Sequence, residues 1–236
     1  MADPRFFFPN FRSSDCTVEL DSEQAHHALK VLRLGEGDAV ELFDGQGRVA
    51  GGRIDSARGG LAVRIREIRQ TAVPKPGIDL AAAIPKGPRA DEMVQLLSQL
   101  GVNRLICLRS ERAVVEPSPG RLERFDRIAL ESAKQCRRAH LLQIAPSADL
   151  AAVLACDYDL RLIAQVGADP IDHLAAQLRR TGRVLIVVGP EGGFTDAELK
   201  LARQNGALGW CLGPNVLRIE CAAAAAVAVA RYLSTQ

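Results

Sequence analysis

The sequence lacks the residue spacings that mark metal-binding and disulfide-rich proteins. Its six cysteines include no Cys-x-x-Cys pair, and it has only four histidines. Metal sites and disulfide frameworks need such residues in recurring groups. The sequence therefore indicates no metal site and no disulfide-linked domain. We expect the cysteines to be reduced, buried and apolar in character.

Long apolar runs are also missing. No stretch reaches the roughly 20 residues of a membrane-spanning helix without a charge, and the Ala-rich run 222–230 is typical of a buried helix. The first nine residues lack the apolar core and the small-residue cleavage site of a secretion signal. We therefore expect no membrane span and a location in the cytoplasm.

The common nucleotide-binding fingerprints are absent as well. No Gly-x-Gly-x-x-Gly follows the strand predicted at 78–84, and Gly-x-x-x-x-Gly-Lys-Ser/Thr occurs nowhere. These glycines normally let the backbone cradle a phosphate. Their absence argues against a dehydrogenase or methyltransferase of the Rossmann type and against a P-loop NTPase.

Two domains are predicted, over residues 1–73 and 74–236. In the first, one helix is predicted at 21–34 and strands at 17–20, 39–43, 48–54 and 61–68, which indicates a small, curved, mostly antiparallel β domain. Residues 71–77 contain two prolines and a glycine and are typical of a linker.

Strands and helices alternate in the second domain, which predicts an α/β fold with a mostly parallel sheet covered on both faces. The predicted strands span 78–84, 104–108, 160–166, 184–188 and 210–212. The predicted helices span 90–100, 122–138, 150–155, 171–178, 197–205 and 221–233.

A glycine-rich loop follows one of these strands. Gly189-Pro-Glu-Gly-Gly-Phe194 comes after an apolar, β-branched run and before Thr195-Asp-Ala-Glu198, a capping box that begins a helix. Glycines at the carboxyl end of such a strand permit close approach to a ligand. A plain strand-to-helix turn is about as compatible with this loop alone. A second loop of similar composition, from Leu212 to Ala222, favours the ligand.

Charge is unevenly distributed along the chain. Residues 1–73 carry ten basic and eleven acidic residues, a net charge of −1, whereas residues 86–140 carry eleven and seven, a net charge of +4. Most of the basic residues are arginine, which suits contacts with phosphate. This distribution is a modest indication of a nucleic-acid partner.

The two loops together resemble the SPOUT class of methyltransferases and, within it, the RsmE family, the 16S ribosomal RNA (uracil-1498-N3)-methyltransferases. The specific part is Ile-Val-Val-Gly-Pro-Glu-Gly-Gly-Phe followed by Leu-Gly-Pro-x-x-Leu-Arg-x-Glu-x-Ala. Further segments similar to the family are Arg5-Phe-Phe7, His27-Ala-Leu-Lys-Val-Leu-Arg33 with Gly37-Asp38, Lys86-Gly87 with Arg89, Leu100-Gly-Val102, and Gln135 with Arg138.

The chain departs from the family pattern at four positions. Cys221 stands where threonine is usual, Leu96 and Gln99 replace a Lys and a Glu, and Leu142 replaces a proline. None of these changes removes a glycine of the two loops.

The resemblance implies a PUA-like β-barrel domain, then a SPOUT domain with a parallel sheet and a deep trefoil knot. It also implies a homodimer that binds S-adenosylmethionine and methylates N3 of a uridine in 16S ribosomal RNA, with 16S rRNA or the 30S subunit as partner and no metal. The implied cofactor-binding residues are Gly189, Glu191, Gly192, Gly193, Leu212, Gly213, Pro214, Leu217, Glu220, Cys221 and Ala222.

Methylation of N3 requires removal of its proton. Glu191 and Glu220 are the carboxylates nearest the implied cofactor, and Arg218 is placed to steady an oxygen of the uracil anion. We therefore name Glu191 and Arg218 as candidate catalytic residues. An ion pair between Arg218 and a carboxylate is the other interpretation.

The candidates for phosphate contact are Arg5, Arg33, Lys86, Arg89, Arg137 and Arg138. Solvated surface charge is the competing interpretation for each of them. Two other functions stay open: a non-catalytic RNA-binding or ribosome-assembly factor, suggested by Cys221 and the replaced Lys and Glu, and a SPOUT methyltransferase with a different RNA target. The family residues of the first domain argue against the second.

Overall fold

A computed structural model describes residues 3–9, 11–12, 16–56, 60–169, 171 and 173–235. The chain forms two compact units. One consists of Met1–Val73 and Ala133–Leu141, and the other of Pro74–Ser132 and Leu142–Gln236. Residues 133–141, which the sequence-based division assigned to the second domain, therefore pack with the first.

The first unit is built on a five-stranded sheet in the order β1-β3-β4-β5-β2. Only β1 and β3 pair in parallel; the other pairs are antiparallel, as predicted. Phe6, Leu42 and Leu61 are among the buried residues of its core. The strands are β1 Arg5–Phe7, β2 Thr17–Leu20, β3 Ala39–Phe43, β4 Arg48–Ser56 and β5 Leu61–Gln70. Strand β1 was not predicted because three residues are too few to show a period.

The helix predicted at 21–34 is shorter and irregular. It begins as α1 (Ser22–His26) and continues as a π-helical turn, η1 (His27–Val31). Asp21 caps it, since its side chain accepts a hydrogen bond of 2.8 Å from the backbone N–H of Gln24. The chain then leaves the helix, and Arg33 has a φ of +56°.

The second unit contains a six-stranded, wholly parallel sheet in the order β11-β9-β10-β6-β7-β8. The strands are β6 Gly77–Ala82, β7 Arg104–Arg109, β8 Gln143–Asp149, β9 Leu160–Ala164, β10 Arg183–Val188 and β11 Ala207–Trp210. Strand β8 was missed because it is an edge strand containing a proline and has no apolar alternation.

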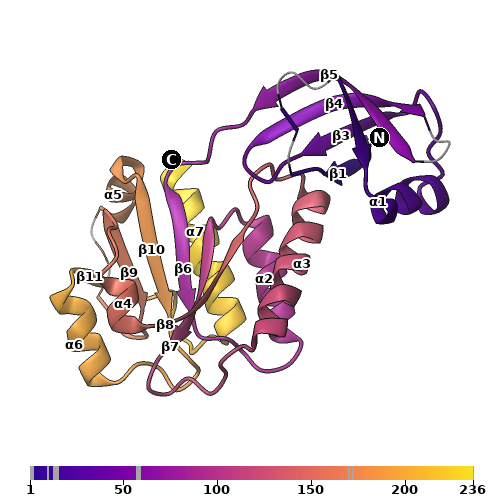
Figure 1. The fold of residues 1–236 in the computed structure, drawn as a ribbon. Helices are drawn as coiled ribbons and strands as arrows, with labels where there is room; N and C mark the ends of the chain where they lie inside the picture. Colours follow the sequence, from indigo (N-terminus) through magenta and orange to yellow (C-terminus); the bar gives the residue numbers. More distant parts are fainter. Residues whose placement is uncertain are drawn as a thin grey trace. The chain divides into compact units, whose positions relative to one another are not determined.

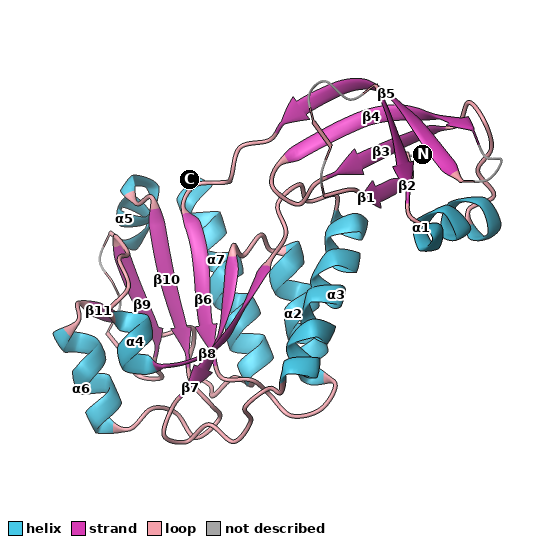
Figure 2. Ribbon diagram, in the orientation of Figure 1, coloured by secondary structure: helices cyan, strands magenta, loops and turns pink. Residues whose placement is uncertain are grey.

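Helices cover both faces of this sheet (Figures 1 and 2). One core cluster packs α2, α3, α5 and α7 against the sheet, and another packs α4 and α6 on the opposite face. The predicted parallel, doubly covered sheet is confirmed; the trefoil knot stays a prediction. The helices are α2 Arg89–Gln99, α3 Pro119–Cys136, α4 Leu150–Leu154, α5 Leu174–Arg180, α6 Asp196–Gln204 and α7 Ile219–Thr235.

Strand β10 shows why these strands have continuous apolar sequences. Val184 and Ile186 belong to the core on one face, and Leu185 and Val187 to the core on the other. A strand buried on both faces needs apolar residues at every position.

The cysteines differ from the expectation. Cys107 is buried, but Cys16, Cys156 and Cys221 are exposed, and all six are free. No helix in the described ranges is long and apolar enough to cross a membrane.

Candidate active site at the carboxyl ends of the strands

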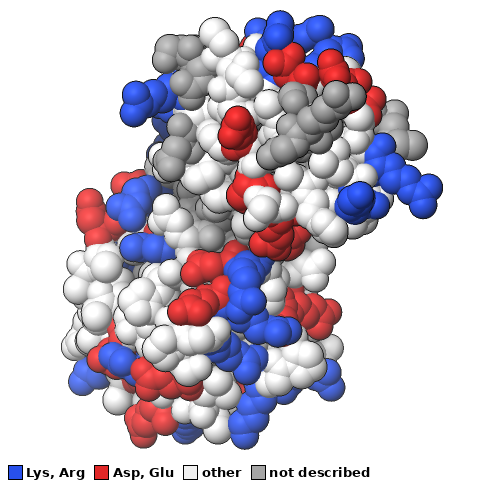
Figure 3. Space-filling model, turned by 45° about the vertical axis from the view of Figure 1, so that its right-hand side comes forward, with Lys and Arg blue, Asp and Glu red and all other residues white. Residues whose placement is uncertain are grey.

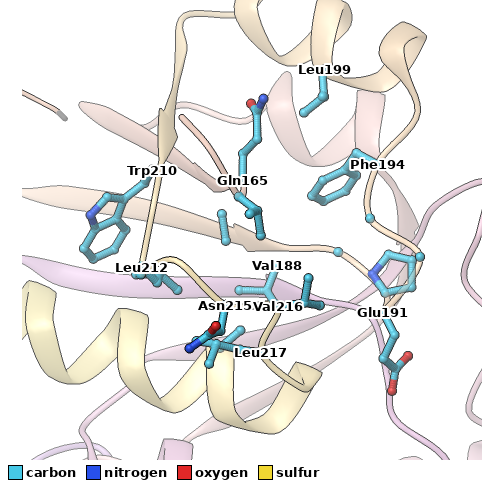
Figure 4. Close-up of a pocket in the computed structure, with 18 residues that line it drawn as sticks. Gln165, Val188, Glu191, Phe194, Leu199, Trp210, Leu212, Asn215, Val216 and Leu217 are labelled. Carbon is cyan, nitrogen blue, oxygen red and sulfur yellow. The ribbon is translucent and has the colours of Figure 1, made fainter. Parts of the chain in front are cut away.

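A cavity of about 370 Å³ lies where β9, β10 and β11 end (Figure 4). The two glycine-containing loops supply much of its wall. Among the residues predicted to bind the cofactor, those that line this cavity are Gly189, Glu191, Gly192, Gly193, Leu212, Gly213, Leu217 and Ala222. Pro214 and Cys221 are exposed outside its lining, and Glu220 is buried beside it.

The first loop is held in one conformation by local contacts. The N–H of Gly193 donates to the carbonyl of Pro190 at 2.8 Å, and Gly193 has a φ of +69°. Arg112 donates from Nη1 to the carbonyl of Gly192 at 2.6 Å. At Gly189, a Cβ would lie 2.8 Å from the Phe194 ring, so only glycine fits there.

Helix α6 starts immediately after this loop, as predicted. The Thr195 hydroxyl accepts from the N–H of Glu198 at 3.3 Å, and the Glu198 carboxylate accepts from the N–H of Thr195 at 2.8 Å. The capping box is therefore confirmed.

The second loop provides the other side of the cavity. Gly213 has a φ of +148°, and its carbonyl accepts a hydrogen bond from the Cys211 thiol at 3.2 Å. Helix α7 then begins, with the N–H of Ala222 donating to the carbonyl of Arg218 at 2.8 Å.

Sequence reasoning missed several lining residues, including Gln165, Phe194, Trp210 and Asn215. Figure 4 shows these four side chains around the cavity, drawn from different strands and loops. Gln165 directly follows β9, so the rule that ligands lie at the carboxyl ends of parallel strands could have identified it. The cavity combines apolar walls with a few amide and backbone polar groups, the usual composition of a small-molecule site.

One arginine and two carboxylates meet beside this cavity. The Nη1 atom of Arg89 lies 3.5 Å from Oε1 of Glu191 and 3.7 Å from Oε1 of Glu220. The Glu191 side chain is half exposed, whereas that of Glu220 is only 8% exposed. Glu220 Oε2 is buried and has no hydrogen-bond partner among the described residues. Arg218 is exposed, which does not fit the alternative of a buried ion pair with a carboxylate, and Glu220 is paired with Arg89.

The prediction that Arg5 contacts RNA is wrong. Its side chain is 3% exposed, with Nε 3.0 Å from Glu41 and Nη1 donating to the carbonyl of Ala133 at 3.1 Å. The guanidinium lies 4.1 Å from the centroid of the Phe43 ring. Burial lowers the pKa of Arg5, although Glu41 opposes this shift. Arg5 therefore holds the first unit together and is not available to a phosphate.

The other predicted RNA contacts lie at or near the surface. In the first unit Arg33 and Arg137 are exposed and Arg138 is half-buried. Arg137 is also held by Glu41 at 3.1 Å. In the second unit Lys86 is exposed and Arg89 is half-buried. On the face drawn in Figure 3, basic and acidic side chains are interspersed.

Within the described ranges, no group of three or more His, Cys, Asp or Glu side chains could hold a metal ion.

Comparison with known proteins identifies relatives over nearly the whole chain. Residues 73–231 match a model of the RNA methyltransferase domain, and residues 20–66 match a model of the RNA methyltransferase PUA domain. The chain is similar to the ribosomal RNA small subunit methyltransferase E of Synechocystis sp., with 30% identity over 91% of this chain and 72% of that protein. It is also similar to the protein of that name from Rickettsia conorii, with 29% identity over 98% of this chain and 96% of the relative.

Two solved structures are similar over 98% of both chains. One is a ribosomal RNA small subunit methyltransferase E from Neisseria gonorrhoeae bound to S-adenosylmethionine, with a TM-score of 0.88 and 28% identity. The other is a putative methyltransferase from Legionella pneumophila with bound S-adenosylmethionine, with a TM-score of 0.82 and 27% identity.

Proposed function

The chain belongs to the RNA methyltransferase family, within the ribosomal RNA small subunit methyltransferase E group, and we propose that it methylates N3 of a uridine, uracil-1498, in 16S ribosomal RNA with S-adenosylmethionine as methyl donor. The observation that carries this proposal is the cavity formed by the two glycine-containing loops at the carboxyl ends of β9, β10 and β11.

The residues of this cavity fit S-adenosylmethionine. Apolar side chains such as Phe194 and Leu217 suit the faces of a purine ring, and Gln165 and Asn215 offer polar groups. At Gly193 and Gly213, nothing lies within 4 Å of where a Cβ would stand, so the backbone is accessible to a ligand. When bound, S-adenosylmethionine supplies a methyl group on a positively charged sulfur.

Two side chains are proposed to act on the uracil. Glu191 lines the cavity with half of its side chain exposed, and it accepts the N3 proton. N3 forms its bond to the methyl carbon as the carbon–sulfur bond breaks, with the electron pair remaining on sulfur. Arg218, exposed just before α7, donates to one carbonyl oxygen of the ring and balances the charge that develops there.

A homodimer is part of this proposal. Helix α7, which contributes Ala222 to the lining of the cavity, leaves Val229 41% and Tyr232 63% exposed, with Cys221 exposed two turns before Val229. A row of apolar side chains on one helix face suits burial against a second copy. Tyr232→Glu is expected to yield monomers in sedimentation velocity; a wild-type chain that sediments as a monomer at micromolar concentration would refute the dimer.

Primer extension on 16S RNA tests the reaction and its target together. Methylation of N3 blocks base pairing, so reverse transcriptase should stop one nucleotide before the modified uridine in wild-type cells and read through in a deletion strain. Wild-type protein should restore the stop, and Glu191→Gln should restore it poorly. A stop that persists in the deletion strain would contradict the assigned target.

Calorimetry addresses the remaining two interpretations. A non-catalytic RNA-binding factor would give no heat with S-adenosylmethionine. A methyltransferase with a different target would bind the cofactor in calorimetry, but the 16S primer-extension stop would then persist in the deletion strain.

A further inference from the structure

A second cavity, of about 250 Å³, shares Pro190 and Glu191 with the cofactor cavity. Ala83 and Ile84, which follow β6, line it together with the start of the loop after β10. Strands β6 and β10 are neighbours at the point where the sheet order reverses: β7 and β8 lie on one side, and β9 and β11 on the other. Ligands of open α/β sheets bind at such a reversal.

The lining of the second cavity combines apolar walls with positive charge. Val114, Val115 and Ile219 offer aliphatic surface, and Lys86 and Arg89 supply two cations. A flat ring that carries carbonyl oxygens fits this combination, because its faces are apolar and its edge accepts hydrogen bonds.

Arg89 can donate to such a ring. Both of its carboxylate contacts are long, at 3.5 and 3.7 Å, and both involve Nη1. A guanidinium has five N–H donors, so most of them are not used by these carboxylates. The side chain is 34% exposed and lines the cavity, so a ligand can reach it.

Glu220 explains how Arg89 is held there. Its carboxylate is 8% exposed, and its Oε2 atom has no partner within the described part of the chain. A carboxylate buried in this way is costly unless a cation compensates it. Arg89 is that cation, and the pair links the start of α2 to the start of α7.

We propose that the second cavity receives the acceptor uracil, that Arg89 donates to a carbonyl oxygen of its ring, and that Glu220 positions Arg89. This inference rests on the proposed uridine methylation. When N3 gives its proton to Glu191, negative charge spreads onto both ring oxygens. That charge is lost again as N3 bonds to the methyl carbon and the carbon–sulfur electron pair stays on sulfur. Arg89 stabilises one ring oxygen from inside the cavity, and Arg218 stabilises the other from the solvent side.

Donation to O4 in particular would give selectivity against cytosine, because O2 is present in both bases. Cytosine carries an amino group, a donor, where uracil carries O4. A guanidinium directed at that position would meet another donor, and neither group could then accept a hydrogen bond. A site built to donate to an acceptor strongly rejects a base that presents a donor there.

Arg89→Gln, Arg89→Lys and the control Arg179→Gln test the role of Arg89. Arg179 is exposed on α5 and lines neither cavity. Methyl transfer to small-subunit RNA is measured against pH, and cofactor affinity is measured separately from the fluorescence of Trp210, the single tryptophan of the sequence. Arg89→Gln is expected to lower kcat/KM by about 100-fold and to leave cofactor affinity within about twofold. Its rate should keep rising at pH values where the wild-type rate has levelled off, because N3 must then ionise without the guanidinium.

Arg89→Lys should recover part of the rate, since it restores the charge without the planar donors, and Arg179→Gln should match the wild type. A wild type that methylates uridine while Arg89→Gln keeps its rate and pH profile would overturn this inference alone. A wild type that methylates no uridine of small-subunit RNA overturns the proposed function, and this inference falls with it.

A double-mutant cycle tests Glu220 as a positioning residue. Glu220→Gln should slow the reaction and shift the pH profile in the direction of Arg89→Gln, and the double variant should be no slower than Arg89→Gln. Additive losses would mean that Glu220 acts independently of Arg89 and would remove the positioning role.

Discussion

Gly213→Ala should weaken binding of S-adenosylmethionine without unfolding the protein. Gly213 lines the cofactor cavity and has a φ of +148°, a backbone conformation that residues with a Cβ rarely adopt. Nothing lies within 4 Å of the position of the added Cβ. The substitution therefore introduces backbone strain and no clash with the rest of the chain.

The expected size of the effect follows from that strain. Holding a non-glycine residue in such a region costs on the order of 1–3 kcal/mol. The loop can relieve the strain by moving, and it must then be returned to the binding conformation when the cofactor enters. That free energy is subtracted from the free energy of cofactor binding, so the dissociation constant of the cofactor should rise by about 5–150-fold.

Titration of Trp210 fluorescence measures the change, because this tryptophan lines the same cavity. The matched control is Gly206→Ala. Gly206 has a φ of +74°, also has nothing within 4 Å of its Cβ position, and does not line the cavity. This control should lower the Tm by a few degrees and leave cofactor affinity unchanged. Equal affinities for Gly213→Ala and the wild type, or equal losses in both variants, would refute the reasoning.

Three further predictions concern stability and reactivity. Arg5→Ala should lower the free energy of unfolding in urea by about 2 kcal/mol, because it removes a buried partner of Glu41, a hydrogen bond to the carbonyl of Ala133 and the contact with the Phe43 ring, while Arg69 and Arg137 still compensate Glu41; a surface role would give almost no loss. Thr195→Ala should cost about 1 kcal/mol in the same assay through loss of the cap of α6, and an unchanged midpoint would argue against the cap. Burial raises the pKa of the Cys107 thiol to about 12, so a thiol reagent at pH 8 should label Cys107 only after unfolding. Because the folded state favours the neutral thiol, the contribution of Cys107 to the free energy of unfolding is complete below the unfolded pKa of about 8.5 and is lost as pH rises toward 12. Rapid labelling of the native protein at pH 8 would contradict the burial of Cys107.

Arg5 shows where inference from the sequence failed. Its place beside two phenylalanines matches the family pattern, and a charged side chain near a chain terminus is normally exposed. The deciding partners are Glu41 and the carbonyl of Ala133, which are 36 and 128 residues away. No local pattern shows contacts between residues so distant in the sequence.

The loops that line the cofactor cavity were easier to predict. Gly189, Gly193 and Gly213 occupy positions where close packing or a positive φ requires glycine. The residue type therefore indicates the local backbone conformation. Gln165 and Trp210 join them only because the ends of β9 and β11 lie beside β10 in the sheet order.

The sequence by itself determined most of the elements, the parallel sheet and the two loops, because apolar periodicity, capping residues and glycines act over a few neighbouring positions. Strands β1 and β8 lack such a signal and were missed. The sequence also determined the family, through motifs spread over both units. Only the tertiary structure decided that Arg89 stands between Glu191 and Glu220 and that a second cavity adjoins the first. Those residues come from the ends of β6 and β10 and the starts of α2 and α7, and strand order, not sequence spacing, brings them together.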